Sequence, residues 1–182
     1  IRCGLTKWSR RDCVAAVMIL LTTLNAHYIH ASFGLRYLRA NLGELRDQCK
    51  ILEFEIQRRP IEIVEMLLAH QPRIIGIGVY IWNVRESLEV VALLKRIAPE
   101  VCVVLGGPEV SQESRGQPIV ELADYTIAGE ADLAFAQFCR QWLEGVPPAT
   151  KLIHAMLPPL ENVVLPYNEY NADDIAHRVL YV

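Results

Sequence analysis

Short, continuously apolar runs alternate with helix-period stretches over residues 16–145, and this alternation constrains the fold more than any other feature. The apolar runs show no polar alternation that would mark a solvated face. Strands buried on both faces are typical of parallel sheets, whose neighbouring strands need helical crossovers between them. We expect five such strands, at residues 17–23, 49–54, 73–81, 101–105 and 125–128.

The stretches between these strands repeat apolar residues at spacings of three and four, which predicts helices. We expect five helices, at residues 32–46, 60–68, 83–97, 118–122 and 131–143. Asn83 and Glu86 match a capping box at the start of the third helix. Right-handed crossovers then favour a five-stranded, doubly wound parallel sheet with flavodoxin-like order 2-1-3-4-5, a Rossmann-like three-layer α/β/α fold.

The two ends of the chain depart from this pattern. Residues 1–15 are interpreted as an irregular leader, although basic residues before an apolar run also copy the order of a secretory signal. Residues 146–182 are rich in proline and aperiodic until 178–182, where we expect a strand to start. We interpret this last segment as a linker leading into a further domain of a larger protein.

Composition excludes several classes of function. The net charge is −3 and 52% of residues are hydrophobic, so a large core is expected and the basic surface of a nucleic-acid binder is not. No apolar run reaches the ~20 residues that span a bilayer. The five cysteines show no CxxC or other close metal spacing, which is typical of the reducing cytoplasm. We therefore expect a cytoplasmic globular protein without a membrane span.

Glycines follow the last two strands at the edge where ligands of open parallel sheets bind. Gly106, Gly107 and Pro108 come directly after one strand, and Gly129 and Glu130 come after the next. Glycines at this edge either make room for a ligand against the backbone or form tight turns. Free N–H groups after Gly129 could also favour an anion, or the segment is an ordinary turn.

Aromatic and imidazole side chains lie on the loops after the first and third strands. His27 or His30, which flank Tyr28, could be a metal or cobalt ligand or a proton carrier, or both could be ordinary loop residues. Tyr80 and Trp82 could stack on a planar ring, or could close the edge of the sheet as core residues.

Several catalytic and nucleotide-binding motifs are absent from the sequence. It contains no GxGxxG after the first strand, no GxxxxGK[ST] and no GxSxG. The third strand does not end in aspartate, which argues against a phosphoacceptor receiver domain. No nucleophile–base pair can be proposed from spacing, so the chain is interpreted as a binding domain and not as a catalyst.

Four segments, taken in order, resemble the N-terminal cobalamin (B12)-binding domain of B12-dependent radical SAM proteins. They are Thr22–Ala26, Gly76–Asn83, Val104–Glu109 and Ile127–Ala131. That group includes methyltransferases and the anaerobic magnesium-protoporphyrin monomethyl ester cyclase. The resemblance covers residues 17–145 and implies the same five-stranded fold. It also implies two partners, a corrinoid and a radical SAM domain of the same chain.

The resemblance implies a corrinoid over the strand ends, with its nucleotide tail inside the domain. Gly106 and Gly107 match the glycines that make room for the tail, so we expect Gly107→Val to block the tail and leave the fold largely intact. The implied cofactor-binding residues are Asn25, His27, Tyr28, Val79, Tyr80, Ile81, Trp82, Asn83, Gly106, Gly107, Pro108, Glu109, Gly129 and Glu130. No catalytic residue is implied in this chain.

The sequence departs from better-known B12 proteins in two ways. Their DxHxxG motif is replaced by a stretch that keeps His27 but has Asn25 in place of the aspartate. A carboxylate orients such an imidazole, and the radical SAM members of this group generally lack a histidine ligand, so the resemblance implies base-off cobalamin without a bond from His27 to cobalt. No CxxxCxxC occurs, so we expect the [4Fe–4S] cluster and S-adenosylmethionine to be bound elsewhere in the parent protein.

Two alternatives to a cobalamin domain stay open at this point. One is a flavodoxin-like regulatory or interaction domain without a cofactor, and the other is a nucleotide- or flavin-binding domain.

Overall fold

A six-stranded parallel sheet forms the centre of the molecule. The structure is a computed structural model that describes residues 18–26, 30–112 and 116–180. The strand order is β2-β1-β3-β4-β5-β6. The strands are β1 (Ile19–Asn25), β2 (Cys49–Glu55), β3 (Ile74–Gly78), β4 (Cys102–Gly106), β5 (Tyr125–Ala128) and β6 (Leu152–His154). The predicted order of the first five strands is confirmed, and β6 extends the sheet from within the segment expected to be a linker.

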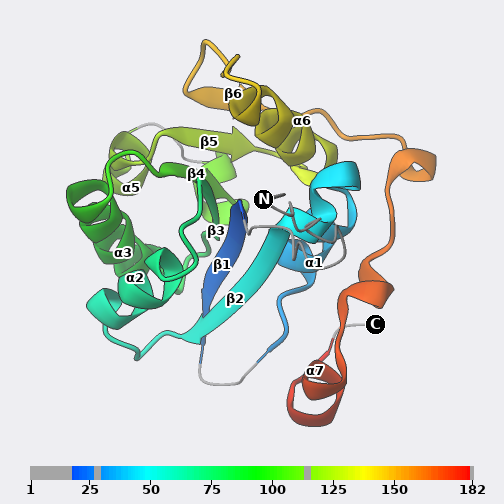
Figure 1. Cartoon of the computed structure of the whole chain (residues 1–182), viewed down its shortest axis with the longest axis horizontal. Coiled ribbons are helices and arrows are strands. Elements are labelled where there is room, and N and C mark those ends of the chain that lie inside the picture. The colour runs from blue at the N-terminus through cyan, green and yellow to red at the C-terminus, as the bar shows by residue number, and fades with distance from the viewer. Residues whose placement is uncertain (1–17, 27–29, 113–115, 181–182) are drawn as a thin grey trace, which may run out of the picture.

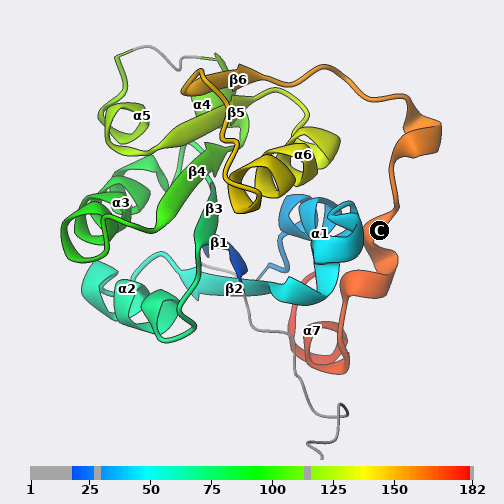
Figure 2. The same ribbon diagram turned by 45° about the horizontal axis from the view of Figure 1, so that its top comes forward.

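Helices cover both faces of this sheet, as Figures 1 and 2 show. The α-helices are α1 (Phe33–Ala40), α2 (Pro60–Leu68), α3 (Val84–Ile97), α4 (Pro108–Gln112), α5 (Pro118–Leu122), α6 (Asp132–Leu143) and α7 (Ala172–His177). Three 3-10 helices complete the described elements: η1 (Gly43–Gln48), η2 (Leu160–Asn162) and η3 (Pro166–Glu169). Helices α1 and α6 lie on one face, and α2, α3 and α5 lie on the other.

Each strand of the central sheet contributes side chains to both faces in alternation. On β1, Leu20 and Leu24 pack in the cluster under α2 and α3, whereas Ile19 and Leu21 pack in the cluster under α1 and α6. All four are buried, as expected for parallel strands covered by helices on both sides. This alternation decides which face any residue of a central strand borders.

Three local features differ from what the sequence led us to expect. The helix expected over 32–46 ends at Ala40, and the chain continues as η1, whose first residue Gly43 has φ of +59°. Of the strand expected at 178–182, the described residues form only a bridge between His30 and Val179. Helix α4 was not expected, because Val110 is the one buried apolar residue in its sequence PEVSQ and a single such residue shows no helical period.

No helix within the described residues is long and apolar enough to cross a membrane. The expected leader, residues 1–15, lies outside the part of the chain that the structure describes, as do His27 and Tyr28.

A glycine-floored slot as the candidate functional site

Glycines on two neighbouring strands leave the backbone bare on the face covered by α1 and α6. Gly78 of β3 pairs in register with Gly106 of β4, and Gly76 lies one step below on the same face. A Cβ added to Gly106 would meet only the carbonyl oxygen of Ile127, at 3.8 Å, and would otherwise point into open space. The sheet therefore offers a cradle that a side chain at this position would fill.

This floor belongs to a slot of about 150 Å³ between the two helices, at the carboxyl edge of the sheet. Helix α1 contributes Gly34 and Leu35 to its walls, and α6 contributes Asp132 and Phe135. Pockets that enclose a whole small molecule measure roughly 300–1,000 Å³. The slot therefore has room for one part of a ligand and not for an entire cofactor.

Gly107, next to the slot floor, is required by the backbone itself. Its φ is +109°, and a Cβ there would lie 2.4 Å from the carbonyl oxygen of Val79. Both the left-handed conformation and the contact exclude a larger residue. The expectation that Gly107→Val leaves the fold largely intact is therefore wrong, and Gly106 is the neighbouring glycine where an added Cβ would point into open space.

Gly129 stands at a second turn that is tied to the first. Its φ is +96°, and its N–H donates to Oγ of Ser111 at 3.1 Å. The Ser111 hydroxyl in turn donates to the carbonyl oxygen of Gly107 at 2.8 Å. Burial, assisted by the charge of Glu130, raises the pKa of Asp132 at this turn. A bonded N–H and two neighbouring carboxyl groups fit an ordinary turn better than an anion site.

The aromatic pair after β3 lies at the surface of the site. The rings of Tyr80 and Trp82 stack with centroids 4.6 Å apart and an interplanar angle of 9°. Trp82 is 51% exposed and Ile81 is 76% exposed, so neither residue closes a core. Tyr80 lines the slot, and burial raises the pKa of its phenol.

A broader hollow of about 400 Å³ adjoins the slot, and we call it the carboxyl-edge hollow. Gly34 and Tyr80 line both spaces, whereas Trp82 and Asn25 line the hollow and not the slot. A narrow, apolar slot beside a wider hollow with an aromatic wall suits a ligand that has a flat body and a narrower extension.

Asn83 positions this aromatic segment from inside the protein. Its side chain is fully buried, accepts the N–H of Tyr80 at 2.8 Å, and donates to the carbonyl oxygen of Leu24 at 3.0 Å and to Oγ1 of Thr23 at 3.2 Å. It makes no capping bond to α3, so the expected capping box is wrong. The residue instead joins the end of β1 to the loop after β3.

The remaining predicted site residues fall into different places. Val79 is buried in the cluster on the opposite face of the sheet, under α2 and α3. Pro108 and Glu109 begin α4 and do not line the slot. His27 and Tyr28 lie outside the described residues. No group of three or more His, Cys, Asp or Glu within the described ranges could hold a metal ion.

Sequence reasoning missed Gly76 and Gly78 as parts of the site. Their separation by two residues on an expected strand was the available signal, because side chains two apart share one face of a sheet. Gly34 and Phe135 gave no signal of their own, since their place beside the slot depends on how α1 and α6 pack.

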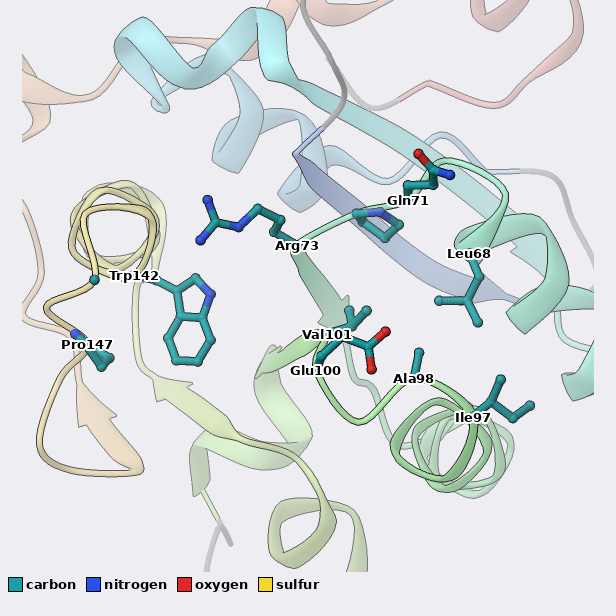
Figure 3. Close-up of a pocket in the computed structure, with 11 residues that line it drawn as sticks. Leu68, Gln71, Arg73, Ile97, Ala98, Glu100, Val101, Trp142 and Pro147 are labelled. Atoms are coloured by element: carbon teal, nitrogen blue, oxygen red, sulfur yellow. The ribbon is translucent and has the colours of Figure 1, made fainter.

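A larger hollow of about 780 Å³ lies at the opposite, amino edge of the sheet, and we call it the amino-edge hollow. Figure 3 shows Trp142 and Pro147 on one side of it and Leu68 and Ile97 on the other. It lies between helix ends and the loops that enter β3 and β4. Ligands of open α/β sheets bind at the carboxyl ends of strands, so this hollow is not the candidate site.

Comparisons with known proteins bear on the family and the fold of this chain. The chain is 30% identical over 84 residues to the cobalamin-dependent radical SAM methyltransferase TokK of Streptomyces tokunonensis. That match covers 44% of this chain and 12% of the methyltransferase, so the chain spans only a small part of that relative.

Two solved structures show the same fold at low sequence identity. A cobalamin-binding protein from Desulfitobacterium hafniense superposes with a TM-score of 0.52 at 18% identity, covering 70% of this chain and 59% of that one. The RcsB response regulator of Salmonella typhimurium gives a TM-score of 0.50 at 7% identity, with 75% and 65% covered. The B12 binding domain family matches residues 19–139, a span that holds β1 to β5 and the whole slot. On this match the chain belongs to the family of B12-binding domains.

Proposed function

We propose that this chain is the cobalamin-binding part of a larger B12-dependent radical SAM enzyme, and that it holds the corrinoid at the carboxyl edge of its sheet. The observation that carries the proposal is the slot, whose floor at Gly78 and Gly106 is bare backbone. The family match supports the cofactor, and the 84-residue similarity to a radical SAM methyltransferase supports the kind of parent enzyme.

The two spaces at this edge divide the proposed contacts. Gly78 and Gly106 would take the nucleotide tail of cobalamin between α1 and α6. Tyr80 and Trp82 would border the corrin, because they line the carboxyl-edge hollow and expose apolar ring surface there. Cobalamin supplies a cobalt centre that can carry a methyl group. The side chains of this domain bind the cofactor and exclude water from one of its faces.

We further propose base-off cobalamin without an imidazole ligand from this chain. Asn25, which stands where an aspartate would orient the imidazole, donates its amide to the carbonyl oxygen of His30 at 2.7 Å. Its side chain therefore serves the local backbone. We expect His27→Ala to leave the visible spectrum of the bound corrinoid unchanged, and a changed spectrum would assign His27 to cobalt.

The remaining functions of the parent enzyme are assigned to other parts of it. We propose that a radical SAM domain binds the [4Fe–4S] cluster and S-adenosylmethionine, that residues 146–182 lead toward it, and that its reaction is that of a methyltransferase or a cyclase. The chain itself contributes binding and orientation of the corrinoid.

The direct test is retention of a corrinoid after desalting. The chain and its full-length parent are each mixed with hydroxocobalamin, with flavin mononucleotide as the control ligand, and the eluted protein is scanned for corrin absorbance. We expect the parent to retain cobalamin and not the flavin. Absence of corrin absorbance from both proteins would overturn the proposal, and retention of the flavin alone would favour a flavin-binding domain.

A second measurement asks whether the slot takes the nucleotide tail. Cobinamide has the corrin ring but no nucleotide tail, so it should bind more weakly than cobalamin if the tail occupies the slot. Equal affinities for the two corrinoids would remove Gly78 and Gly106 from the site.

A further inference from the structure

The buried carboxylate of Glu53 joins the candidate site to a distant segment of the chain. Glu53 lies on β2, and its side chain is 2% exposed. Its Oε1 accepts the N–H of Ser32 at 2.5 Å and lies 3.4 Å from Nδ2 of Asn25. Its Oε2 accepts from Arg36 at 3.0 Å and from Arg178. One carboxylate therefore bonds residues on both sides of the connection between β1 and α1, together with a residue near the C-terminus.

Arg178 belongs to residues 164–179, which we call the C-terminal clasp. The clasp runs along the outside of α1, away from β6, in Figures 1 and 2. Its first anchor is a reciprocal pair in which Asn41 donates to the carbonyl oxygen of Val164 at 3.0 Å and accepts its N–H at 2.8 Å. Its second anchor is Glu169, whose side chain is 2% exposed and binds Arg39 and, at 2.7 Å, Arg46.

The last part of the clasp reaches the loop that precedes α1. Asp174 of α7 pairs with Arg36 at 3.0 Å and with Arg178 at 3.4 Å. The carbonyl oxygen of Val179 accepts the N–H of Ala31 at 3.1 Å. Two successive amides of this loop, those of Ala31 and Ser32, are thus held by the clasp and by the carboxylate that the clasp binds.

This loop forms part of the candidate site. Residues 30–34 line the carboxyl-edge hollow together with Tyr80 and Trp82. Ser32 and Tyr80 thus border the same space. The position of Ser32 therefore shapes the space beside the aromatic wall that we assign to the corrin.

We propose that Glu53 is a positioning residue for corrinoid binding, and that the end of the C-terminal clasp, residues 174–179, sets the affinity of the site by fixing residues 31 and 32 together with Glu53. This inference rests on the proposed function. Holding the loop in one conformation before the ligand arrives lowers the conformational entropy that binding must overcome. The arginines also need their carboxylate, because removing one partner of a buried ion pair leaves an uncompensated charge.

A matched pair of variants, Glu53→Gln and Glu169→Gln, tests the proposal. Each of these glutamates has a side chain that is 2% exposed and binds two arginines, and only Glu53 contacts the loop. Hydrogen exchange measured without cobalamin should be about tenfold faster at the Ser32 amide in Glu53→Gln, since a charge-assisted bond is weakened. Glu169→Gln should keep the wild-type rate there, because Asp174 and Arg178 still hold the end of the clasp on Arg36 and Glu53. Equal acceleration in both variants would show general loosening and overturn the proposal.

The second readout is the affinity of the full-length protein for hydroxocobalamin. We expect about tenfold weaker binding in Glu53→Gln and a change of less than about twofold in Glu169→Gln. Faster exchange at Ser32 with unchanged affinity would overturn the positioning role. A wild-type protein that holds no cobalamin would refute the proposed function and the effect on affinity, while the exchange rates still decide whether the clasp orders the loop.

Arg178→Gln covers the case in which Glu53→Gln does not fold. The Arg178 side chain is 21% exposed and bridges Glu53 and Asp174 from the outside of the pair. Faster exchange at Ser32 in this variant supports the proposal, and an unchanged rate overturns it.

Discussion

The slot and the amino-edge hollow lie at opposite edges of one sheet and differ in how their walls are made. The slot measures about 150 Å³ and rests on bare strand backbone, whereas the amino-edge hollow measures about 780 Å³ and is lined by side chains from helix ends and loops. The larger space is thus the less specific one. Missing side chains on two paired strands identify a ligand site better than volume does.

One glycine from each space, Gly106 and Gly145, shows the same difference between the slot and the amino-edge hollow. Gly106 lies within β4 and has none of the positive φ values that require glycine, so its missing side chain matters for what lies above it. Gly145 borders the amino-edge hollow with φ of +80°, and a Cβ there would meet no atom within 4 Å. Gly145 therefore serves the turn after α6, whereas Gly106 serves the slot.

The largest effect is expected from Gly107→Val. Left-handed strain and the contact with Val79 should together lower the free energy of unfolding by about 3 kcal/mol or more, measured by urea denaturation. Gly145→Val is the matched control, because it has the strain without the contact, and it should lose only about 1–2 kcal/mol. Equal decreases in the free energy of unfolding would mean that the close approach to Val79 does not contribute to the destabilisation.

Gly106→Val should weaken binding without lowering stability. The added side chain fills the floor of the slot, so the affinity for cobalamin should fall by about ten- to a hundredfold, as expected for overpacking by 1–3 kcal/mol. Spectrophotometric titration measures this affinity, and cobinamide is the control ligand because it has no tail. A variant that binds cobalamin as tightly as the wild type would show that the slot is no more important for binding than the amino-edge hollow.

Asp132 lines the slot, and its titration should make the stability of the protein depend on pH. Burial and Glu130 raise its pKa above the ordinary value of 3.8 in the folded state. The folded protein therefore binds this proton more tightly, and the stability it gains is present at low pH and lost as pH rises through the raised pKa. Asp132→Asn should remove this loss and be more stable than the wild type at neutral pH, by less than about 1 kcal/mol because solvent screens the group. A stability difference that does not vary with pH would contradict the assignment.

The smallest effect is expected at the amino-edge hollow. Ile97 is 50% exposed there, so Ile97→Trp enlarges a side chain in the larger space just as Gly106→Val does in the smaller one. Cobalamin affinity should change by less than about twofold, and stability by less than about 0.5 kcal/mol, as for most surface substitutions. A marked loss of cobalamin binding would show that the two edges are coupled.

Periodicity predicted most of the fold because the strands and helices are long enough to show it. Tyr125–Ala128 is confirmed as β5, and the strand order follows from chain connectivity and handedness. Strand β6 was missed because three residues carry no period. Its pairing depends on backbone bonds such as that from the Ala155 N–H to the carbonyl oxygen of Ala128, at 2.8 Å.

The candidate site was predictable in position but not in the role of each residue. The sequence does not distinguish Gly106 from Gly107. Only the positive φ of Gly107 and its distance to Val79 show that Gly107 is required by the turn, whereas Gly106 forms the slot floor. Asn83 matched a capping pattern, yet its amide bonds β1 instead. Glu53 gave no signal because Arg178, one of its partners, is 125 positions away in the chain.

The pairing of Gly78 with Gly106 sets stability against function at one place in the sheet. Two opposed glycines supply no cross-strand side-chain pair, and a β-branched residue in a strand is favoured over glycine by up to about 1 kcal/mol. Gly106 has no positive φ, and an added Cβ there would make no close contact. Selection for heat resistance alone would therefore replace this glycine early, and the variants it enriched would be robust proteins that had lost their ligand.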